Sequence, residues 1–584
     1  MTDRNSAHPL IEINGRPLGD AFDHVLVSAV IDDHLYLPDM FTLRFHDLRR
    51  QLLDEAGFKV GVSLRISAPP THRDTPELLI SGEITALEAE FGAQGSYAVV
   101  RGYDHSHRMH RGRRTETYKQ MTDADIARKI AARSNLLVGQ IDATPGVHDL
   151  VSQANLTDLD FLKGRAREIG FELFVSEKKL NFRKPPESQA GPGTGDLQSR
   201  NPLQLAFGDM LESFRPRVTS AEQVSRVEVR GWDMHNKKEV VAHAAGKTTS
   251  ATIGANPSEL AAKFGESTFV SVNRALSSQA EVDAAARSLA EQVASAFTEA
   301  DGVAKGDPKL KAGAAVAISL VGKPFEGQYV LTSTRHVFDD QGYRTQFVVS
   351  GRQDRSLLGV ATLGATGGSS SAAGPPIYGV VIALVTNSKD PEDLGRVKLK
   401  FPWMSNDYET DWARVTQVGA GHNRGQVVIP EVNDEVLVAF EHGDIRAPFV
   451  VGSLYNGKDK PKMGEGLIDS GSGEITRRGF VSRKGHMQVF FDGDGKEGIA
   501  LLTDDRGMKI SLNKSKTTIR ITSSGKVEIK GTTDVTIEAG TSLSLKAGTT
   551  ATIEAGTSLE LSAPEVKVSG DAMVTVSGGM IKLN

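Results

Sequence analysis

The sequence contains no cysteine, which excludes a disulfide framework and any metal site built on thiolates. It has no run of about 18 apolar residues, so it predicts no membrane-spanning helix. Neither sign of charge dominates, because 68 Lys and Arg stand against 73 Asp and Glu. This balance gives no general electrostatic case for binding nucleic acid or an acidic membrane. The polar start, Met1 to Pro9, lacks a signal peptide's apolar core, and we expect assembly in the cytoplasm.

Common catalytic signatures are also missing from the segment at about 203–358. It contains no G-x-S-x-G, no H-E-x-x-H, no phosphate-binding P-loop and no G-x-G-x-x-G. A chain of 584 residues is nevertheless long enough for about three or four domains.

The last part of the chain, residues 519–584, repeats every eight residues. Each repeat has two apolar residues at positions i and i+2, which share one face of a strand, and a small-residue step that allows a bend. Pro564 shortens one spacing by a residue. The pairs that we predict to point inward are Ile519 and Ile521, Val527 and Ile529, Val535 and Ile537, Leu543 and Leu545, Ala551 and Ile553, Leu559 and Leu561, Val566 and Val568, Val574 and Val576, and Ile581 and Leu583. Periodicity of this kind predicts an elongated repeat structure rather than a globule.

Three arrangements can cover these inward pairs. Three identical chains wound together give each layer a triangular apolar interior, and we favour this intertwined trimer. A single-chain coil with three repeats per turn has only about three turns, which is marginal for a stacked array. An antiparallel meander is the other alternative, although the Asn-Gly and Asp-Gly hairpin turns are absent from this stretch.

The first part of the chain, residues 1–360, predicts a mixed α+β region with two subdomains, at about 1–184 and 203–358. Its clearest helices begin at Thr122 and at Thr157 or Asp158, and Gly170 ends the second one. A third helix, Glu281–Phe297, is expected to point Ala285, Leu289, Val293 and Ala296 inward. The expected strands are Pro9–Asn14, His24–Ile31, Phe41–Phe45, Gly61–Ser67, Leu78–Leu87, Tyr97–Arg101, Phe171–Val175, Leu180–Arg183, Val224–Gly231, Ala315–Val321, Gln328–Thr334, Arg335–Phe338 and Thr345–Ser350.

A Gly-, Ser- and Pro-rich linker, residues 361–376, separates this region from a dense β segment. Five or six short strands within residues 377–456 predict a small closed barrel. The expected strands are Tyr378–Val385, Arg396–Phe401, Trp412–Gln417, Gln426–Ile429, Glu435–Phe440 and Phe449–Leu454. Residues 457–518 then connect the barrel to the repeats.

The barrel segment carries the most specific motifs of the chain. Gly395–Trp403, Trp412–Val415, Gly419–Gly421, Ile429–Asp444 and Pro448–Asn456 together resemble the OB-fold of the VgrG family of contractile-injection spike proteins. Segments Gly102–Arg108, Asp160–Gly170, Gly342–Phe347 and Ser482–Phe491 extend the resemblance to nearly the whole chain. The family is similar to the phage T4 proteins gp27 and gp5 joined in one chain.

This resemblance implies a gp27-like hub, an OB-fold barrel and an intertwined trimeric β-helix prism, in a homotrimer without catalysis or cofactor. It implies that the hub caps the inner tube and meets baseplate components, and that a PAAR-type protein binds the tip at Met580, Ile581, Leu583 and Asn584. The particle is then fired or released outside the cell and touches the target membrane only on puncture. Residues 457–518 are too few for the lysozyme of the phage spike, and we expect any effector cargo to be a separate chain.

Two other function classes stay open from residues alone. A hydrolase on a β-helix would need paired carboxylates or a metal, for which the candidates are Glu431, Asp434 and Glu435, and His486, Asp492, Asp494 and Glu497. An OB-fold that binds nucleic acid needs a basic groove, which the acidic run Asn406–Asp411 argues against. His105, His107 and His110 suggest a metal site, but the arginines among them repel a cation, so we favour a solvated face or an acidic partner.

Overall fold

The computed structural model describes residues 8–68, 75–93, 95–144, 146–195, 201–233, 236, 238–272, 275–352, 377–405, 407–463 and 466–582. Two compact units make up the chain, Met1–Asp459 and Lys460–Asn584. Strands dominate the described residues and helices are few, which confirms the mainly β class with an α+β start. The predicted linker at 361–376 lies outside the described residues.

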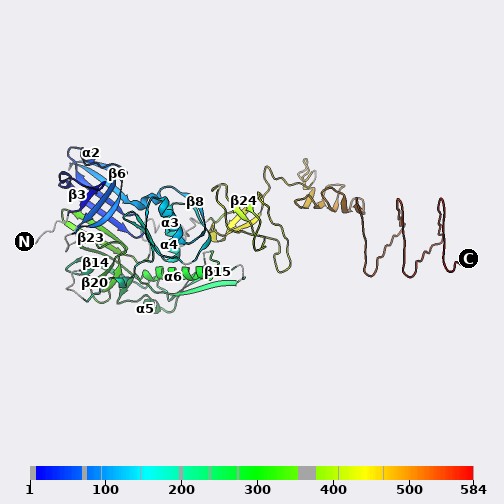
Figure 1. Ribbon diagram of the computed structural model, residues 1–584. Coiled ribbons are helices and arrows are strands. Elements are labelled where there is room, and N and C mark those ends of the chain that lie inside the picture. The colour runs from blue at the N-terminus through cyan, green and yellow to red at the C-terminus, as the bar shows by residue number, and fades with distance from the viewer. Residues whose placement is uncertain are drawn as a thin grey trace, which may run out of the picture. The chain divides into compact units, whose positions relative to one another are not determined.

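One antiparallel sheet runs through the first unit and joins the two predicted subdomains (Figure 1). Strands from the start of the chain and strands from near residue 350 are neighbours in it, because Val30 pairs with Val337. Within the described residues it has 11 strands, in the order β14 (Leu211–Val218), β19 (Thr298–Lys305), β23 (Gly342–Val349), β22 (Ser333–Asp339), β3 (Leu26–His34), β4 (Met40–His46), β7 (Gly95–Asp104), β6 (Glu77–Gly92), β5 (Ser63–Ala68), β1 (Leu10–Ile13) and β2 (Arg16–Pro17).

Four smaller sheets complete the hub in the part of the chain that is described. They are β10 (His148–Leu156) with β8 (Arg114–Met121); β11 (Glu172–Ser176), β12 (Lys179–Arg183) and β9 (Leu137–Ile141); β13 (Gln204–Ala206), β20 (Ala315–Ser319), β21 (Gly327–Val330) and β17 (Ala251–Ile253); and β16 (Lys238–Ala245), β15 (Arg226–Asp233) and β18 (Thr268–Ser271). The predicted boundary between strands at Thr334 and Arg335 is wrong: β21 ends at Val330 and β22 begins at Ser333.

The helices begin and end at the residues that cap them. Thr122 and Asp125 form the predicted capping box at α3, and Gly170 ends α4 with a φ of 72°, a conformation that glycine adopts without strain. The helices are α1 (Asp20–Asp23), α2 (Leu52–Glu55), α3 (Asp123–Arg133), α4 (Asp158–Ile169), α5 (Pro257–Ala262) and α6 (Gln279–Ser295), with 3-10 turns η1 (His105–His110), η2 (Ser188–Ala190) and η3 (Glu441–Gly443).

The predicted inward face of α6 is partly wrong. Ala285 is buried as expected, but Leu289 and Val293 are only half-buried, and Ala296 lies just past the helix end. The buried stripe consists mainly of small residues, Val282, Ala285, Ala286, Ser288, Ala290 and Ala294. Small side chains let α6 lie close against β15 and β16, whereas the larger Leu289 packs at the border of this cluster.

The barrel that follows is a five-stranded sheet over the described residues, in the order β25 (Lys398–Lys400), β24 (Val381–Asn387), β27 (Glu435–Phe440), β28 (Pro448–Ser453) and β26 (Arg414–Val415). The predicted strand Gln426–Ile429 is wrong, because these residues form a loop. The Gln417 side chain holds Val428 there by donating to its carbonyl oxygen, at 2.8 Å, and accepting from its N–H group, at 2.9 Å.

The second unit contains an antiparallel meander followed by an extended chain. The meander strands are β29 (Arg477–Val481), β30 (Met487–Phe491), β31 (Gly498–Leu502), β32 (Met508–Asn513) and β33 (Thr518–Ser523). The first predicted apolar pair, Ile519 and Ile521, therefore lies in β33, paired with Leu512 and Ile510. Residues 524–582 contain no hydrogen-bonded strand within this chain and follow a path that turns back repeatedly (Figure 1).

Candidate functional site

One face of the meander consists mainly of large apolar side chains, with Arg478 and Gln488 among them. Cross-strand partners share a face in a sheet, and Phe490, Ile499, Leu512 and Ile519 form one such row across four strands. A second row contains Leu501, Ile510 and Ile521, and Phe480 extends the face onto β29. All eight are exposed, with Leu501 at 50% and Ile519 at 72%. We call these residues the meander face.

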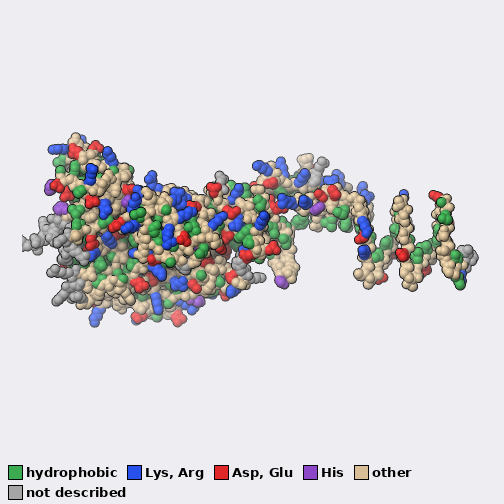
Figure 2. Space-filling view, viewed as in Figure 1, with side chains coloured by type: hydrophobic (Ala, Val, Ile, Leu, Met, Phe, Trp, Pro, Cys, Tyr) green, Lys and Arg blue, Asp and Glu red, His purple; other side chains and the backbone are tan. Residues whose placement is uncertain are grey.

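The opposite side of the same sheet is built differently. Val489 and Ala500 are each 1% exposed there. A Cβ at Gly498 would lie 2.2 Å from the carbonyl oxygen of Leu512, so this position requires glycine for the strands to approach. Met487, Phe491 and Leu502 also lie on this side and are half-buried, so the two sides differ in how far their apolar side chains are exposed. In Figure 2 hydrophobic side chains gather along the lower side of the meander.

The repeat region continues this exposed apolar surface. The predicted inward pairs are not buried within one chain. Two apolar side chains per repeat cannot exclude water without a partner. Their exposed fractions run from 51% at Ile581 to 79% at Leu545. The exposed members are Ile519, Ile521, Val527, Ile529, Val535, Ile537, Leu543, Leu545, Ile553, Leu559, Leu561, Val566, Val568, Val574, Val576 and Ile581.

The two members of a pair differ in exposure in a regular way. The second member is the more exposed one at every repeat from 527 to 576 in which both values are known, as in Val527 at 56% and Ile529 at 72%. The second members of these pairs are Ile529, Ile537, Leu545, Leu561, Val568 and Val576. This recurrence shows that the repeats share one local conformation, as their spacing predicts. The inward assignment itself stays a prediction about the assembled protein.

The predicted tip residues continue the same surface. Met580 and Ile581 are exposed, whereas Leu583 and Asn584 lie outside the described residues. A soluble protein rarely exposes so many large apolar side chains in sequence, so this surface is expected to be covered by another molecule.

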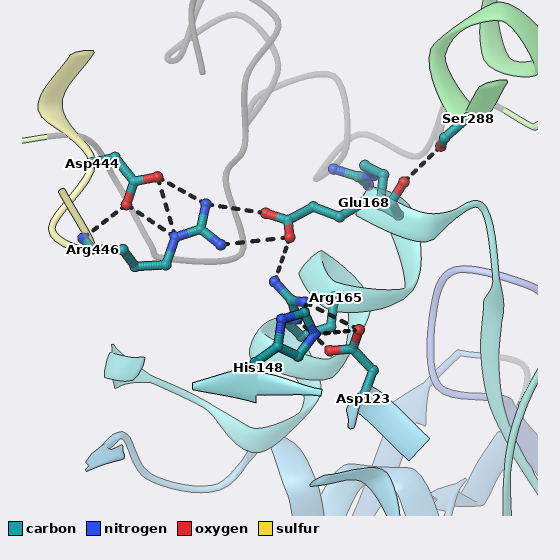
Figure 3. A network of polar contacts seen from close by, with 8 residues as sticks. Asp123, His148, Arg165, Glu168, Ser288, Asp444 and Arg446 are labelled. Carbon is teal, nitrogen blue, oxygen red and sulfur yellow. Dashed lines mark hydrogen bonds and ion pairs between the residues drawn. The ribbon is translucent and has the colours of Figure 1, made fainter. Parts of the chain in front are cut away.

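A second site joins the barrel to the hub through a network of alternating charges (Figure 3). Arg446, in the turn between β27 and β28, donates to Asp444 at 2.8 Å and lies 3.3 Å from Glu168 at the end of α4. Glu168 also accepts from Arg165 one turn earlier. Arg165 in turn donates to Asp123 at the start of α3, with its Nε atom 2.6 Å from Oδ1.

Burial and pairing set the ionisation of this network. Burial opposes the charge of Asp123, but the hydrogen bond with His148 and the charge of Arg165 outweigh it and lower its pKa to about 2. Burial likewise opposes the charge of Arg446, yet Glu168 and Asp444 hold its pKa above the ordinary value. The network therefore stays charged near neutral pH.

Apolar and polar contacts surround this joint. Ala154 of β10 packs into the hydrophobic core of the barrel, and Tyr408 of the barrel is 3% exposed. Lys119 of β8 lies 3.5 Å from Glu409. Sequence reasoning missed this joint, because Glu168 and Arg446 are 278 positions apart and neither stands in a local motif that points to the other.

The three candidate metal ligands of the hub have different surroundings, and the prediction of a solvated face fails for His105, which is buried. His107 lies 2.9 Å from Glu83, Arg108 forms two hydrogen bonds with the same carboxylate, and His110 is exposed. Burial opposes the charge of Glu83, but these partners lower its pKa to about 2. No group of three potential ligands in the described residues is arranged to hold a metal ion.

The acidic candidates are likewise engaged elsewhere. Asp492 pairs with Arg478, Glu497 pairs with Lys514 at 3.0 Å, and His486 lies 3.6 Å from Asp504. Asp434 accepts from the N–H group of Glu431 at 2.8 Å, as a turn does, and Glu435 accepts from Asn456 at 2.9 Å. These contacts are those of turns and surface ion pairs.

Comparisons with known proteins agree with this architecture. The family described as the Alg8 N-terminal domain matches residues 49–340, half of the 584 residues, and the chain belongs to this family. The family described as the type VI secretion system/phage-baseplate injector OB domain matches residues 381–455, which span β24 to β28. No helix in the described residues has the length and apolar character that crossing a membrane requires.

Curated relatives match over a limited region. The type VI secretion system spike protein VgrG1c of Pseudomonas aeruginosa is 28% identical over 151 residues, 22% of this chain and 21% of that protein. The spike protein VgrG3 of Vibrio cholerae is 33% identical over 138 residues, 22% of this chain and 13% of that protein. The chain therefore spans less than a quarter of the length of these relatives.

This chain is similar to a solved structure described as a half-lidded Francisella PdpA–VgrG complex. The match covers 89% of this chain and 88% of that chain. Its TM-score is 0.52 at 8% identity, so the likeness concerns the fold. The predicted resemblance to VgrG spike proteins is confirmed by these matches, and so is the OB domain.

Proposed function

We propose that this chain, which belongs to the Alg8 N-terminal domain family and carries a phage-baseplate injector OB domain, is the structural spike of a contractile injection machine. In this proposal the spike is a homotrimer. The observation that carries it is the exposed apolar surface formed by the meander face and the repeat pairs of residues 519–582. Nothing in the described part of the chain covers this surface, which favours association with identical chains.

Threefold association covers the surface without any further element. Three copies of the meander face, arranged around one axis, form a closed apolar interior, and the repeat pairs extend it along the same chain. Fully burying one Leu or Ile side chain contributes about 1.5–3 kcal/mol. Because each layer of the prism buries such side chains from three chains, the gain easily exceeds that of a surface ion pair.

The proposal assigns a role to each part of the chain. Residues 1–360 form the hub that caps the inner tube and meets baseplate components, and residues 377–456 form the OB-fold that follows it. Residues 519–584 form the intertwined prism, whose end binds a PAAR-type tip protein through Met580, Ile581, Leu583 and Asn584. Cargo is carried as separate chains, and the spike itself punctures the envelope without performing catalysis.

The test is the mass of the full-length protein in dilute buffer, measured by analytical ultracentrifugation. The expected result is three times the 62.7 kDa of one chain. A variant that ends before Thr517 lacks the repeats and should trimerise more weakly, and it should not retain a tip protein. A well-folded full-length monomer of 62.7 kDa would show that the exposed apolar surface has another purpose.

A further inference from the structure

Three aspartate side chains line one small cavity inside the hub. Asp33 stands near the end of β3, Asp39 in the connection from β3 to β4, and Asp104 at the end of β7. The cavity has a volume of about 100 Å³ and is also lined by residues of α4 and β11. It therefore lies where the large sheet meets the helical part of the hub.

Each carboxyl group accepts a hydrogen bond from the backbone. Asp33 accepts from the N–H group of Ala312 at 3.0 Å, and Asp39 accepts from that of His34 at 3.0 Å. Asp104 accepts from both the N–H and the hydroxyl group of Ser106, at 3.1 and 2.5 Å. These contacts fix the three carboxyl groups in place.

Asp33 and Asp39 line the same small cavity, and burial, followed by the charge of Asp33, raises the pKa of Asp39. Two ionised carboxylates have acceptor oxygens only, so a hydrogen bond shared between them needs a proton on one of them. Like charges this close disfavour double ionisation, as in other paired carboxyl groups. The lining of one small cavity by three carboxyl groups therefore favours a retained proton.

The cavity is lined by other charged or titratable side chains, which are His34, Lys163, Glu172, Arg183 and Lys311. Lys163 of α4 donates to the carbonyl oxygen of Tyr36, in the same β3–β4 connection. Lys311 donates to the carbonyl oxygen of Leu78 at 2.7 Å, and Arg183 donates to Glu172 at 2.8 Å. His34 accepts from the N–H group of Tyr36 through Nδ1 at 2.9 Å.

We propose that Asp33, Asp39 and Asp104 bind a proton at the joint between the large sheet and helix α4, and that losing this proton loosens the joint. The β3–β4 connection is the moving part, because it carries Asp39 and is tied to α4 through Lys163 and Tyr36. When the cluster ionises, adjacent negative charges repel within a space too small to hydrate them fully.

Burial is the main physical cause of proton retention. It raises the pKa of Asp33 and Asp39 above the ordinary aspartate value, despite the favourable backbone hydrogen bonds, and it raises that of Asp104 to about 7. A group whose pKa is higher in the folded state stabilises the fold in acid, and this contribution is lost as pH rises through the folded value. The hub is therefore expected to lose stability between mildly acid and mildly alkaline pH.

The first test uses the unmodified full-length protein. Infrared spectra at about pH 7 should show the carbonyl stretch of a protonated carboxyl group, because an ordinary aspartate is ionised at this pH. The band should weaken in Asp39→Asn and should fade in the parent as pH rises. Absence of a protonated carboxyl band at neutral pH in the parent would overturn the proposal, whether or not the variant folds.

The second test follows thermal unfolding of the hub from about pH 5 to about pH 9. The parent should melt at progressively lower temperature as pH rises, while Asp39→Asn and Asp104→Asn should flatten this dependence. Asp340→Asn, at an exposed turn between β22 and β23, is the matched control and should keep the parental slope. Equal slopes for the parent and both cluster variants would contradict the proposed role of the cluster.

Discussion

Arg446 of the OB domain and Glu168 of helix α4 form an ion pair with 3.3 Å between their closest atoms. Their side chains are 26% and 22% exposed, so solvent screens the pair only in part. Glu168 is in turn bonded to Arg165 on the same helix. This contact makes the OB domain continuous with the hub's own charge network rather than merely attached through the linker.

Arg446→Ala should loosen the OB domain from the hub. The substitution leaves Glu168 and Asp444 without their shared guanidinium, and such a loss costs about 1–3 kcal/mol. Scanning calorimetry should resolve a separate, earlier OB transition in the variant, whereas the parent should unfold both parts together. Arg424→Ala, at an exposed loop position of the same domain, is the control and should leave the trace unchanged. If the calorimetric unfolding curve of Arg446→Ala is the same as that of the parent, the apolar contacts around Ala154 and Tyr408 alone hold the OB domain on the hub.

Asp123 should give the hub an acid-sensitive component of stability. Its pKa of about 2 lies below the value of about 3.9 in an unfolded chain. Because the pKa of Asp123 is lower in the folded protein, its carboxylate stabilises the fold above about pH 4. This contribution to the free energy of unfolding is on the order of 2 kcal/mol, and it is lost as the pH falls through about 2. Urea unfolding of the parent and of Asp123→Asn should therefore differ clearly at neutral pH and converge in strong acid.

The control for this prediction is Asp149→Asn. Asp149 is exposed, and its carboxylate accepts a hydrogen bond from the Gln120 side chain at the surface. It should unfold like the parent throughout the pH range. If Asp123→Asn and the parent stay equally far apart in strong acid, the loss reflects packing or backbone contacts at the start of α3 instead of the carboxylate charge.

Local signals in the sequence predicted local structure well. The Thr122 capping box and the glycine stop at Gly170 depend on residues within one helical turn, and both are present. Contacts between distant segments had no such signal. The pairing of β3 with β22, which merges the two predicted subdomains, joins residues about 300 positions apart, and loop entropy gives the sequence no local preference for it.

The candidate assembly surface stays a prediction, and it was made for a related reason. Its periodicity is written in consecutive residues, so the order of the residues alone is enough to assign the pairs to one face. The wrong strand at Gln426–Ile429 shows the limit of this reasoning. Alternating apolar residues occur there as well, but Val427 is 78% exposed and its neighbour bonds to a side chain instead of to a strand.

Leu545→Asp should destabilise the prism, whereas Ser544→Asp should not. If Leu545 points inward, the substitution places three carboxylates in one layer, where lost solvation and mutual repulsion cost several kcal/mol, about 2–7 for a single unpaired polar group. In the same assignment the neighbouring Ser544 points outward, and Ser544→Asp should change stability by about 0.5 kcal/mol or less. Both residues are exposed in a single chain, so only the assembled prism distinguishes them. Equal melting temperatures for the two variants would reject the inward assignment.

In the proposed prism, charges that alternate in sign from repeat to repeat lie at the outer edge. Lys530, Glu538, Lys546 and Glu554 each follow an inward pair by one residue, and all are exposed. Within the chain, Lys530 lies 3.8 Å from Glu528 on the same segment. If successive repeats stack as neighbouring layers, opposite charges lie about 4.8 Å apart along the axis. Each exposed pair contributes only about 0.2–1 kcal/mol, but threefold symmetry repeats every pair.

The larger consequence of this alternation is the register of winding. A slip by one repeat places Lys over Lys and Glu over Glu, a penalty that chemically equivalent apolar pairs do not provide. Replacing both Glu538 and Glu554 by Lys should therefore lower the melting temperature at low salt, and high salt should restore it because screening removes the repulsion. The high-salt measurement is the control, because a loss of stability caused by packing would persist when the charges are screened. If the double Glu variant melts like the parent at low ionic strength, the apolar pairs alone set the register and the alternating charges only keep the spike soluble.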